Sequence, residues 1–339
     1  MKPMTRRKWQ IFKKNRRAYW SLWVFIFIFI VSLCAPFLAD SRPLVLMYKH
    51  TLYFPSIQFV SDDMIGGNLP TEAVYGEEDK VRINANGWAI YPLVPYNYDT
   101  VDYFSTEPFP SSPNRNHLLG TDDQGRDVLS RLLYALRLSL IFTLLLTCFS
   151  ALIGIVIGAV QGYFGGRTDL FIGRFLEIWS SLPQLFILII VSSLIEPGFW
   201  TLLFILLLFG WTTLTGVVRA EFLKTRGLDY VKSAKALGVS DFRIIVRHIL
   251  PNALVAAITY IPFMLAGGIV ALSALDFLGL GLPVGTPSFG ELIRQGKENL
   301  SAPWLGLTAF VVMTTLLSLL LFIGEGVRDA FDPHQEAHE

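Results

Sequence analysis

LSLIFTLLLTCFSALIGIVIGAV, residues Leu138–Val160, is an uninterrupted run without a charged side chain. A helix rises about 1.5 Å per residue, so about 20 apolar residues cross the hydrocarbon core of a bilayer, which is about 30 Å thick. Five more predominantly apolar runs flank it: Ala18–Ala39, Leu170–Ile195, Phe199–Val218, Leu254–Leu280 and Trp304–Ile323. Because lipid offers backbone groups no hydrogen-bond partner, each run is expected to be helical. The sequence therefore predicts an all-α membrane protein with six transmembrane helices.

The overall composition points to the same class. Of 339 residues, 53% are apolar and 16% are charged, whereas soluble domains carry nearer a quarter charged residues. The first run, Ala18–Ala39, is longer than the apolar core of a signal peptide, so we expect it to be retained as a helix. Cys34 and Cys148 lie inside apolar runs and indicate neither a disulfide framework nor a metal site. A lipid bilayer is the expected surrounding, and no nucleic-acid partner is indicated.

Basic residues give the orientation. Residues 1–17 carry eight lysines and arginines and no acidic residue, and such flanks lie on the cytoplasmic side. Six spans return residues 325–339 to the same side as a cytoplasmic tail. The connection between the fourth and fifth runs also falls inside and is basic, as the rule requires. We therefore expect a multi-pass inner-membrane protein with both termini cytoplasmic and a transmembrane domain at residues 138–324.

Residues 40–117 are too long for a simple connector between two spans. They interleave many aromatic residues with glycine and proline, a composition unlike that of disordered segments. We expect a small, partly ordered periplasmic insertion with short strands at Leu44–Tyr48 and Val81–Ile83. Its last part, Pro108–Pro113, has the composition of a Pro/Ser linker.

Residues 118–137 follow the insertion and precede the second span. Thr121 and Gln124 have the spacing of a capping box, and apolar residues then recur at helical intervals. Arg126 and Arg131 fall largely off that apolar stripe. The pattern predicts an amphipathic helix lying at the outer membrane surface.

The connection at residues 229–252 reads DYVKSAKALGVSDFRIIVRHILPN and predicts two short helices separated by Gly238. Apolar residues form one face of each predicted helix, namely Val231, Ala234 and Leu237 in the first and Phe242, Ile245, Val246 and Ile249 in the second. Ser240 can cap the second helix, and Pro251 marks the entry into the next span. From this pattern alone, a docking device and an ordinary interfacial loop are equally good interpretations.

This loop resembles the "EAA" coupling loop of ATP-binding-cassette (ABC) importer permeases, in which Glu-Ala-Ala is followed by a glycine and a Leu-Pro pair. Ser233, Ala234, Gly238, Leu250 and Pro251 occupy the matching positions. Lys232 stands at the family's glutamate position and Ser233 at its first alanine. Three further segments, at residues 117–131, 162–169 and 274–283, are similar to the type C subunit of dipeptide and oligopeptide permeases.

The resemblance implies a type I ABC importer permease with an extracytoplasmic insertion between its first two helices. It implies four kinds of partner: a second homologous permease, two ATPase subunits that use ATP and Mg²⁺, a periplasmic solute-binding protein, and a peptide or peptide-like substrate such as microcin C. No cofactor or metal is expected on this chain. The ATPase contacts would come from Tyr230, Lys232, Ser233, Ala234, Gly238, Asp241, Arg243, Arg247, Leu250 and Pro251.

Ionisable residues and prolines inside the predicted spans are candidates for the transport pathway. Glu177 has Arg174 one turn away, so it can form a structural ion pair or line the pathway. Asp276 can likewise line the pathway or serve only in helix packing. Pro183 and Pro262 are expected to kink their helices and shape a cavity.

The sequence also bears on activity. The segment GELIRQGKE at residues 290–298 has five residues between its glycines and Glu298 after its lysine, so it is not a phosphate-binding loop. We therefore expect no enzymatic activity in this chain, with energy supplied by separate subunits. An importer of nickel or another small solute is the alternative within the class. An ion-driven secondary transporter is disfavoured, because few charged residues lie near the centres of the spans.

Overall fold

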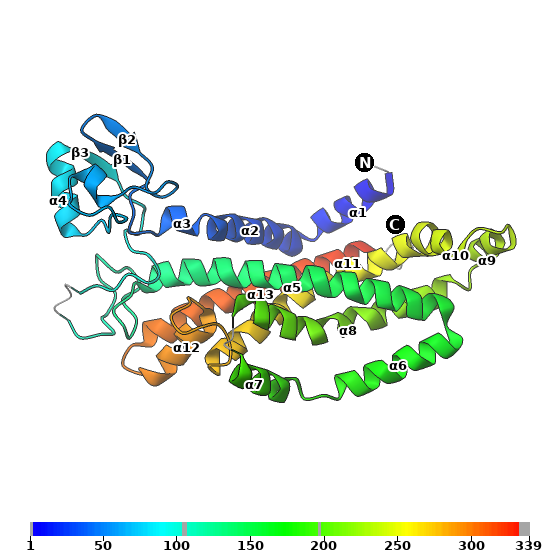
Figure 1. The fold of residues 1–339 in the computed structure, drawn as a ribbon. Helices are drawn as coiled ribbons and strands as arrows, with labels where there is room; N and C mark the ends of the chain where they lie inside the picture. Colours follow the sequence, from blue (N-terminus) through cyan, green and yellow to red (C-terminus); the bar gives the residue numbers. More distant parts are fainter. Residues whose placement is uncertain (1–2, 104–106, 196–197, 332–339) are drawn as a thin grey trace.

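The computed structural model describes residues 3–103, 107–195 and 198–331, and within them the chain is mostly helical (Figure 1). Five helices are long and apolar enough to cross a membrane, and a bent helix pair makes up to six spans. The long helices are α2 (Arg16–Leu33), α5 (Val128–Phe164), α8 (Phe199–Thr225), α11 (Leu250–Phe277) and α13 (Pro303–Phe331). The predicted helical membrane fold is confirmed.

The third predicted span is the bent pair, so its prediction as one helix over Leu170–Ile195 was wrong. α6 (Gly166–Ser180) and α7 (Gln184–Leu194) meet at an angle of 64°. The break falls at Pro183, whose ring removes a backbone donor and keeps the preceding residue out of the helical region. The kink expected at Pro183 is thus a complete break in the helix.

A close approach between α5 and α8 organises the bundle. Gly154, Gly158 and Gly162 recur every fourth residue on α5. A Cβ atom built on each would lie 2.7 Å from a backbone carbonyl oxygen of α8, that of Trp211, Thr215 or Arg219 respectively. Small residues let membrane helices pack backbone to backbone, so this glycine seam requires glycine at each of these positions.

Residues 40–117 include a compact unit at one end of the bundle (Figure 1). Its antiparallel sheet has the order β2-β1-β3, with β1 (Val45–Tyr48), β2 (Thr51–Tyr53) and β3 (Gly87–Ile90). A 3-10 turn (Asp62–Ile65) and α4 (Glu77–Asn86) pack on it through a small apolar core. Its buried residues are Leu46, Val60, Ile65, Ala73, Tyr75 and Ile83. The strand expected at Leu44–Tyr48 is confirmed, whereas Val81–Ile83 belongs to α4 because Ile83 is needed on its buried face.

Residues 117–127 form turns and not the first part of an amphipathic helix, so the helix predicted over residues 118–137 starts late. α5 begins at Val128, where the Asp127 side chain accepts a hydrogen bond from the Ser130 N–H (2.7 Å). Thr121, the predicted cap, is instead buried, and its Oγ1 accepts a hydrogen bond from the Ser111 N–H (2.9 Å). That bond ties the predicted Pro/Ser linker to the start of the transmembrane domain.

Arg126 and Arg131, expected on a polar surface, are both buried. Arg131 pairs with Glu291 of α12 (Phe289–Glu298), and its Nε lies 3.3 Å from Asp122 Oδ2. The same Asp122 oxygen lies 2.7 Å from Arg126 Nη2. Two carboxylates therefore balance two guanidinium groups, which is what makes burial of these charges tolerable.

His117 joins the insertion to the start of α5. Its Nδ1 lies 2.8 Å from Asp127 Oδ2, and its Nε2 lies 3.4 Å from Asp102 Oδ2. Burial by itself would lower the pKa of His117, but the hydrogen bonds and charges of Asp127 and Asp102 outweigh burial, and the pKa is raised. A charged His117 therefore strengthens this contact.

The N-terminal segment forms α1 (Pro3–Lys14), which turns into α2 at Asn15, while α3 (Ala35–Leu38) extends α2 toward the insertion. Phe12 and Ala18 are buried together with Ala330 of α13. The α1–α2 elbow thus packs against the end of the last span. Of the tail predicted at residues 325–339, residues 332–339 lie outside the described part of the chain.

Candidate functional site

The predicted coupling loop lies at the end of the bundle opposite the sheet (Figure 1). α9 (Asp229–Ala236) buries Val231 and Ala234, which join Ile244 and Ile249 in one apolar cluster. The cluster is completed by residues of the spans, namely Ala159, Leu214, Val218, Phe222, Ala253 and Ala257. The loop is therefore a packed extension of α5, α8 and α11.

The tip of this loop leaves two large apolar side chains exposed. Leu237 is 84% exposed and Phe242 is 77% exposed, on either side of Gly238. Gly238 has φ +77°, a left-handed conformation that favours glycine, and a Cβ there would meet no atom within 4 Å. Both residues had been predicted on the apolar faces of their helices, without a prediction of whether those faces are buried. Large exposed apolar side chains that lie close together outside the spans are typical of surfaces that contact another protein.

The second half of the loop winds differently from the predicted helix. After α10 (Asp241–Arg243), residues Ile244–Ile249 form a π-helical turn that leads directly into α11. Pro251 lies in the first turn of α11 and lacks an N–H, so the ordinary hydrogen-bond pattern ahead of it is interrupted. The wider turn buries Ile244 and Ile249 together, in place of the predicted stripe through Phe242 and Val246.

Polar contacts fix the loop to the helix ends. Tyr163 of α5 donates a hydrogen bond to Asp241 (2.5 Å). The Tyr230 hydroxyl donates a hydrogen bond to the carbonyl oxygen of His248 (3.4 Å). Nearby, Arg219 of α8 forms a two-point ion pair with Asp169 of α6 (2.5 and 2.8 Å). The loop is thus held in one orientation relative to α5 and α11.

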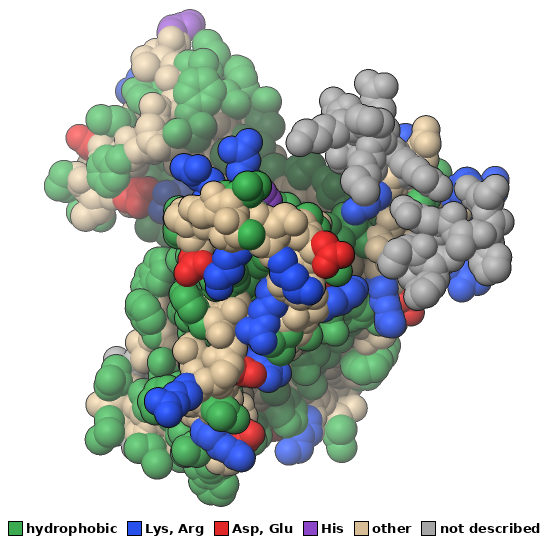
Figure 2. Space-filling model, turned by 90° about the vertical axis from the view of Figure 1, so that its right-hand side faces the viewer, with side chains coloured by type: hydrophobic (Ala, Val, Ile, Leu, Met, Phe, Trp, Pro, Cys, Tyr) green, Lys and Arg blue, Asp and Glu red, His purple; other side chains and the backbone are tan. Residues whose placement is uncertain are grey.

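Basic side chains surround the exposed tip. Figure 2 shows Lys and Arg side chains gathered on this end of the molecule, with few acidic ones among them. Lys232, Ser233, Arg243, Arg247 and Pro251 are exposed, whereas Leu250 is half-buried. Lys232, at the position where the resembled family has glutamate, lies 3.8 Å from Asp229, and both side chains are exposed. The exposed tip therefore combines apolar side chains with nearby basic ones, and Asp229 and Asp241 are the exposed acidic residues of the loop.

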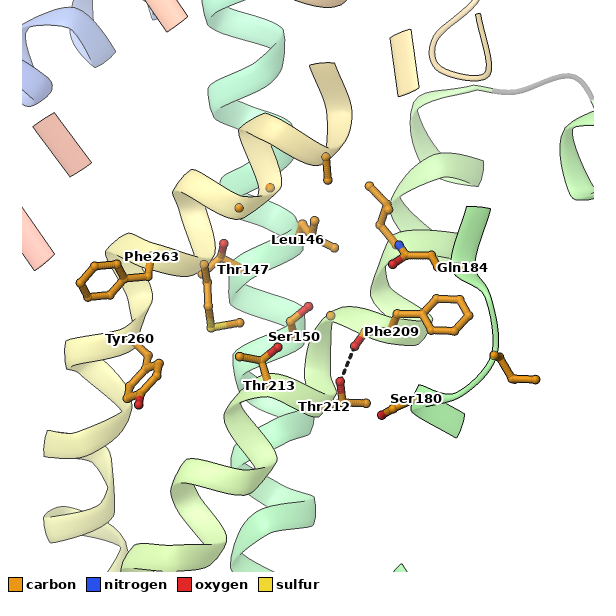
Figure 3. A pocket seen from close by; sticks show the side chains of 17 residues that line it. Leu146, Thr147, Ser150, Ser180, Gln184, Phe209, Thr212, Thr213, Tyr260 and Phe263 are labelled. Atoms are coloured by element: carbon orange, nitrogen blue, oxygen red, sulfur yellow. Dashed lines mark hydrogen bonds between the residues drawn. The ribbon is translucent and has the colours of Figure 1, made fainter. Parts of the chain in front are cut away.

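A cavity of about 640 Å³ opens between α5, the α6–α7 break, α8 and α11 (Figure 3). Its polar lining consists of hydroxyl and amide groups, namely Thr147, Ser150, Ser180, Gln184, Thr212, Thr213 and Tyr260. No charged side chain is among the lining residues of the described chain. The Ser150 hydroxyl is buried without a hydrogen-bond partner among the described residues.

The predicted pathway residues take different positions relative to this cavity. Pro183 and Pro262 do not line it themselves, but their neighbours Leu182, Gln184 and Phe263 do. Pro262 lies inside α11, which continues past it without a break.

The two predicted pathway carboxylates lie elsewhere. Glu177 forms an exposed ion pair with Arg174 (2.6 Å), and Asp276 accepts a hydrogen bond from the Leu282 N–H (2.8 Å). Neither lines the cavity. The lining hydroxyls were missed because Ser and Thr inside apolar runs also bond their own backbone, as Thr212 does to Phe209 (2.8 Å).

A bundle of long apolar helices with one broken helix, an uncharged cavity and a packed loop at one end is typical of the membrane subunit of a transporter. Residues 154–336 match the family of binding-protein-dependent transport system inner membrane components, and residues 4–55 match the N-terminal TM domain of oligopeptide transport permease C. The chain belongs to this permease family, as the coupling-loop resemblance predicted.

Two permease proteins are similar to this chain over nearly its whole length, and a third over most of it. The chain is 50% identical to the inner membrane ABC transporter permease protein YejE of Escherichia coli, over 99% of this chain and 98% of that protein. It is 47% identical to the peptidoglycan transport system permease protein YejE of Agrobacterium fabrum, over 98% and 94% respectively. The oligopeptide transport system permease protein OppC of Lactococcus lactis is 34% identical over 73% of this chain and 85% of its own length.

Proposed function

We propose that this chain is the permease subunit of an ABC importer that moves peptides or peptide-like compounds inward across the inner membrane. The observation that carries the proposal is the rigid loop with Leu237 and Phe242 exposed around Gly238. This surface suits a cleft on an ATPase subunit, which would supply the energy from ATP and Mg²⁺. A second permease would complete the pathway, with two ATPases on the cytoplasmic side and a solute-binding protein on the other.

In this proposal both termini and the docking loop lie in the cytoplasm, and the sheet-containing insertion lies in the periplasm. Support comes from the basic loop and the sheet unit occupying opposite ends of the bundle. Movement of the ATPases would act on α11 directly, because the π-helical turn joins the loop to that helix. α11 carries Tyr260 and Phe263 to the cavity, so movement of the loop changes its shape.

The cavity lining favours a peptide cargo. Hydroxyl and amide groups can donate to and accept from peptide bonds without selecting one side chain. A bare nickel ion would need imidazole, thiolate or carboxylate ligands, and the lining contains none of these within the described residues. The relatives named for peptide and peptidoglycan transport point the same way.

The docking role is tested by Leu237→Asp in the assembled transporter. Burying a charge at the centre of an interface costs about 2 kcal/mol or more, so we expect uptake driven by ATP to fall at least about 30-fold. Leu300→Asp is the matched control, because Leu300 is 85% exposed in the turn after α12, far from the loop. Wild-type uptake by the Leu237→Asp transporter would overturn the assignment of the loop.

The cargo is tested separately in a strain that lacks other peptide uptake systems. Deleting this chain should abolish growth on peptides supplied as the sole source of a required amino acid, while growth on the free amino acid continues. Unimpaired growth on peptides would refute a peptide cargo and leave the docking role untouched.

A further inference from the structure

A second cavity, of about 420 Å³, lies at the elbow between α1 and α2, against the last span. In Figure 1, α1 runs from this elbow toward the end of the bundle that carries α9 and α10. Its lining contains three basic residues, Lys14, Arg16 and Arg17, together with Asn15, Phe322 and Glu325. This second cavity shares no lining residue with the cavity between α5, α8 and α11.

The elbow is held in one shape. The Asn15 side chain accepts a hydrogen bond from the Ala18 N–H (3.3 Å), and its amide donates to Asp329 of α13 (3.3 Å). Arg16 and Arg17 are exposed, and no ion pair joins either to a carboxylate in the described part of the chain. The first turn of α2 adds the partial positive charge of a helix N-terminus to this place.

An aromatic cluster marks the depth of the elbow in the membrane. Trp9 stacks on Phe12 with ring centroids 5.5 Å apart, and Tyr19 packs edge-on against Trp9 (6.4 Å) and Trp23 (6.3 Å). Lys13 Nζ lies 5.6 Å from the centroid of the Trp9 ring. Tyrosine and tryptophan concentrate at the level of lipid headgroups, so the basic cavity lies at that level too.

An apolar stripe leads away from the basic cavity along α2. Trp20, Trp23, Phe27 and Ile30 are 65%, 47%, 67% and 53% exposed. Their spacing of three or four residues puts them on one face of the helix, in line with Arg16. A molecule with an anionic head and an apolar chain could therefore place its head in the basic cavity and its chain along this face of α2. A free phosphate would occupy the cavity alone.

We propose that this elbow binds the headgroup of an anionic phospholipid, with an acyl chain along the Trp20–Ile30 face of α2. Arginine side chains suit the phosphate because their planar guanidinium groups bond two oxygens at once. Basic pockets between transmembrane helices on the cytoplasmic side have this use in general. Glu325 weakens the site, because its carboxylate repels the phosphate.

The test measures lipid retention by the assembled, detergent-purified transporter. Native mass spectrometry compares phosphatidylglycerol with phosphatidylcholine of the same acyl chains. We expect the wild type to retain phosphatidylglycerol preferentially. The double substitution Arg16→Gln/Arg17→Gln should weaken this retention about 30-fold, because each basic residue near a membrane surface strengthens binding of anionic lipid about fivefold.

Two further variants make the result specific. Lys224→Gln removes one exposed charge outside the cavity and should leave retention unchanged. Glu325→Gln should increase retention, a gain that misfolding cannot produce. The proposal is overturned if the double variant retains phosphatidylglycerol like the wild type, if Lys224→Gln loses as much as the double variant, or if Glu325→Gln gains nothing.

Discussion

Replacing Gly158 with alanine tests the packing that holds α5 against α8. The added Cβ would lie 2.7 Å from the Thr215 carbonyl oxygen and 2.9 Å from Val218 Cβ. Ordinary contact begins at 3.4 Å, so the helices must part by about 0.7 Å along the seam. The atom in the way is backbone and cannot rotate aside. Overpacking of this kind costs about 1–3 kcal/mol.

Gly216→Ala is the matched control for this substitution. Gly216 lies on α8 beside Thr215, and a Cβ there would meet no atom within 4 Å. Both substitutions gain the same helix preference of alanine over glycine, about 1 kcal/mol. The difference between the two variants therefore isolates the cost of the close contact.

Thermal unfolding of the purified full-length chain in detergent measures this difference. We expect Gly158→Ala to unfold several degrees below Gly216→Ala, which should match or exceed the wild type. If Gly158→Ala were as stable as Gly216→Ala, the helices would not be in backbone contact, and the glycine seam would have no structural role.

Two other substitutions probe the charged groups around the start of α5. Arg131→Met should cost about 3 kcal/mol in unfolding, the lower end of the range for a broken buried ion pair, because Glu291 then keeps, among the described residues, only its 3.5 Å ion pair with Arg126. Adding Glu291→Gln should recover part of that loss, and a cost below about 1 kcal/mol would contradict the network. The folded state raises the pKa of His117. The protonated His117 therefore stabilises the fold fully below the ordinary histidine pKa, and this stabilisation is lost as the pH rises through the raised pKa. Thermal unfolding of the wild type should therefore show greater stability at pH 6 than at pH 8. His117→Gln should remove this difference, whereas His50→Asn, which replaces an exposed histidine, should preserve it. Equal pH profiles for the two variants would refute the role of His117.

The sequence predicts the helical membrane fold well because long apolar runs have few other uses. It does not separate exposed from buried apolar residues in the loop, since the exposed Leu237 has the same helical spacing as a buried residue. Periodicity also placed Arg131 on a polar surface, because the carboxylate that neutralises it, Glu291, lies far along the chain. Pairing between distant segments is not encoded in local spacing.

Some features could have been found from the residues alone. Gly154, Gly158 and Gly162 repeat the spacing by which membrane helices approach closely, and that repeat predicts the seam with α8. A cavity shaped by Pro183 and Pro262 was expected, but the residues that line it could not be predicted in this way. Its wall depends on how sharply the chain bends at Pro183, and a proline specifies only that some bend or break occurs.

The break between α6 and α7 also bears on whether the cavity beside it holds water. Non-helical backbone at membrane depth is tolerated only where it is buried in protein or borders water, and Ser180, Leu182 and Gln184 border this cavity. Stripping water from a single unbonded peptide group costs about 2–7 kcal/mol. A chamber that stays wet at this break would let the proposed cargo keep much of its hydration shell. In the proposed importer, the energy of ATP would then serve to reverse the direction of access, and little of it would go into dehydrating the peptide.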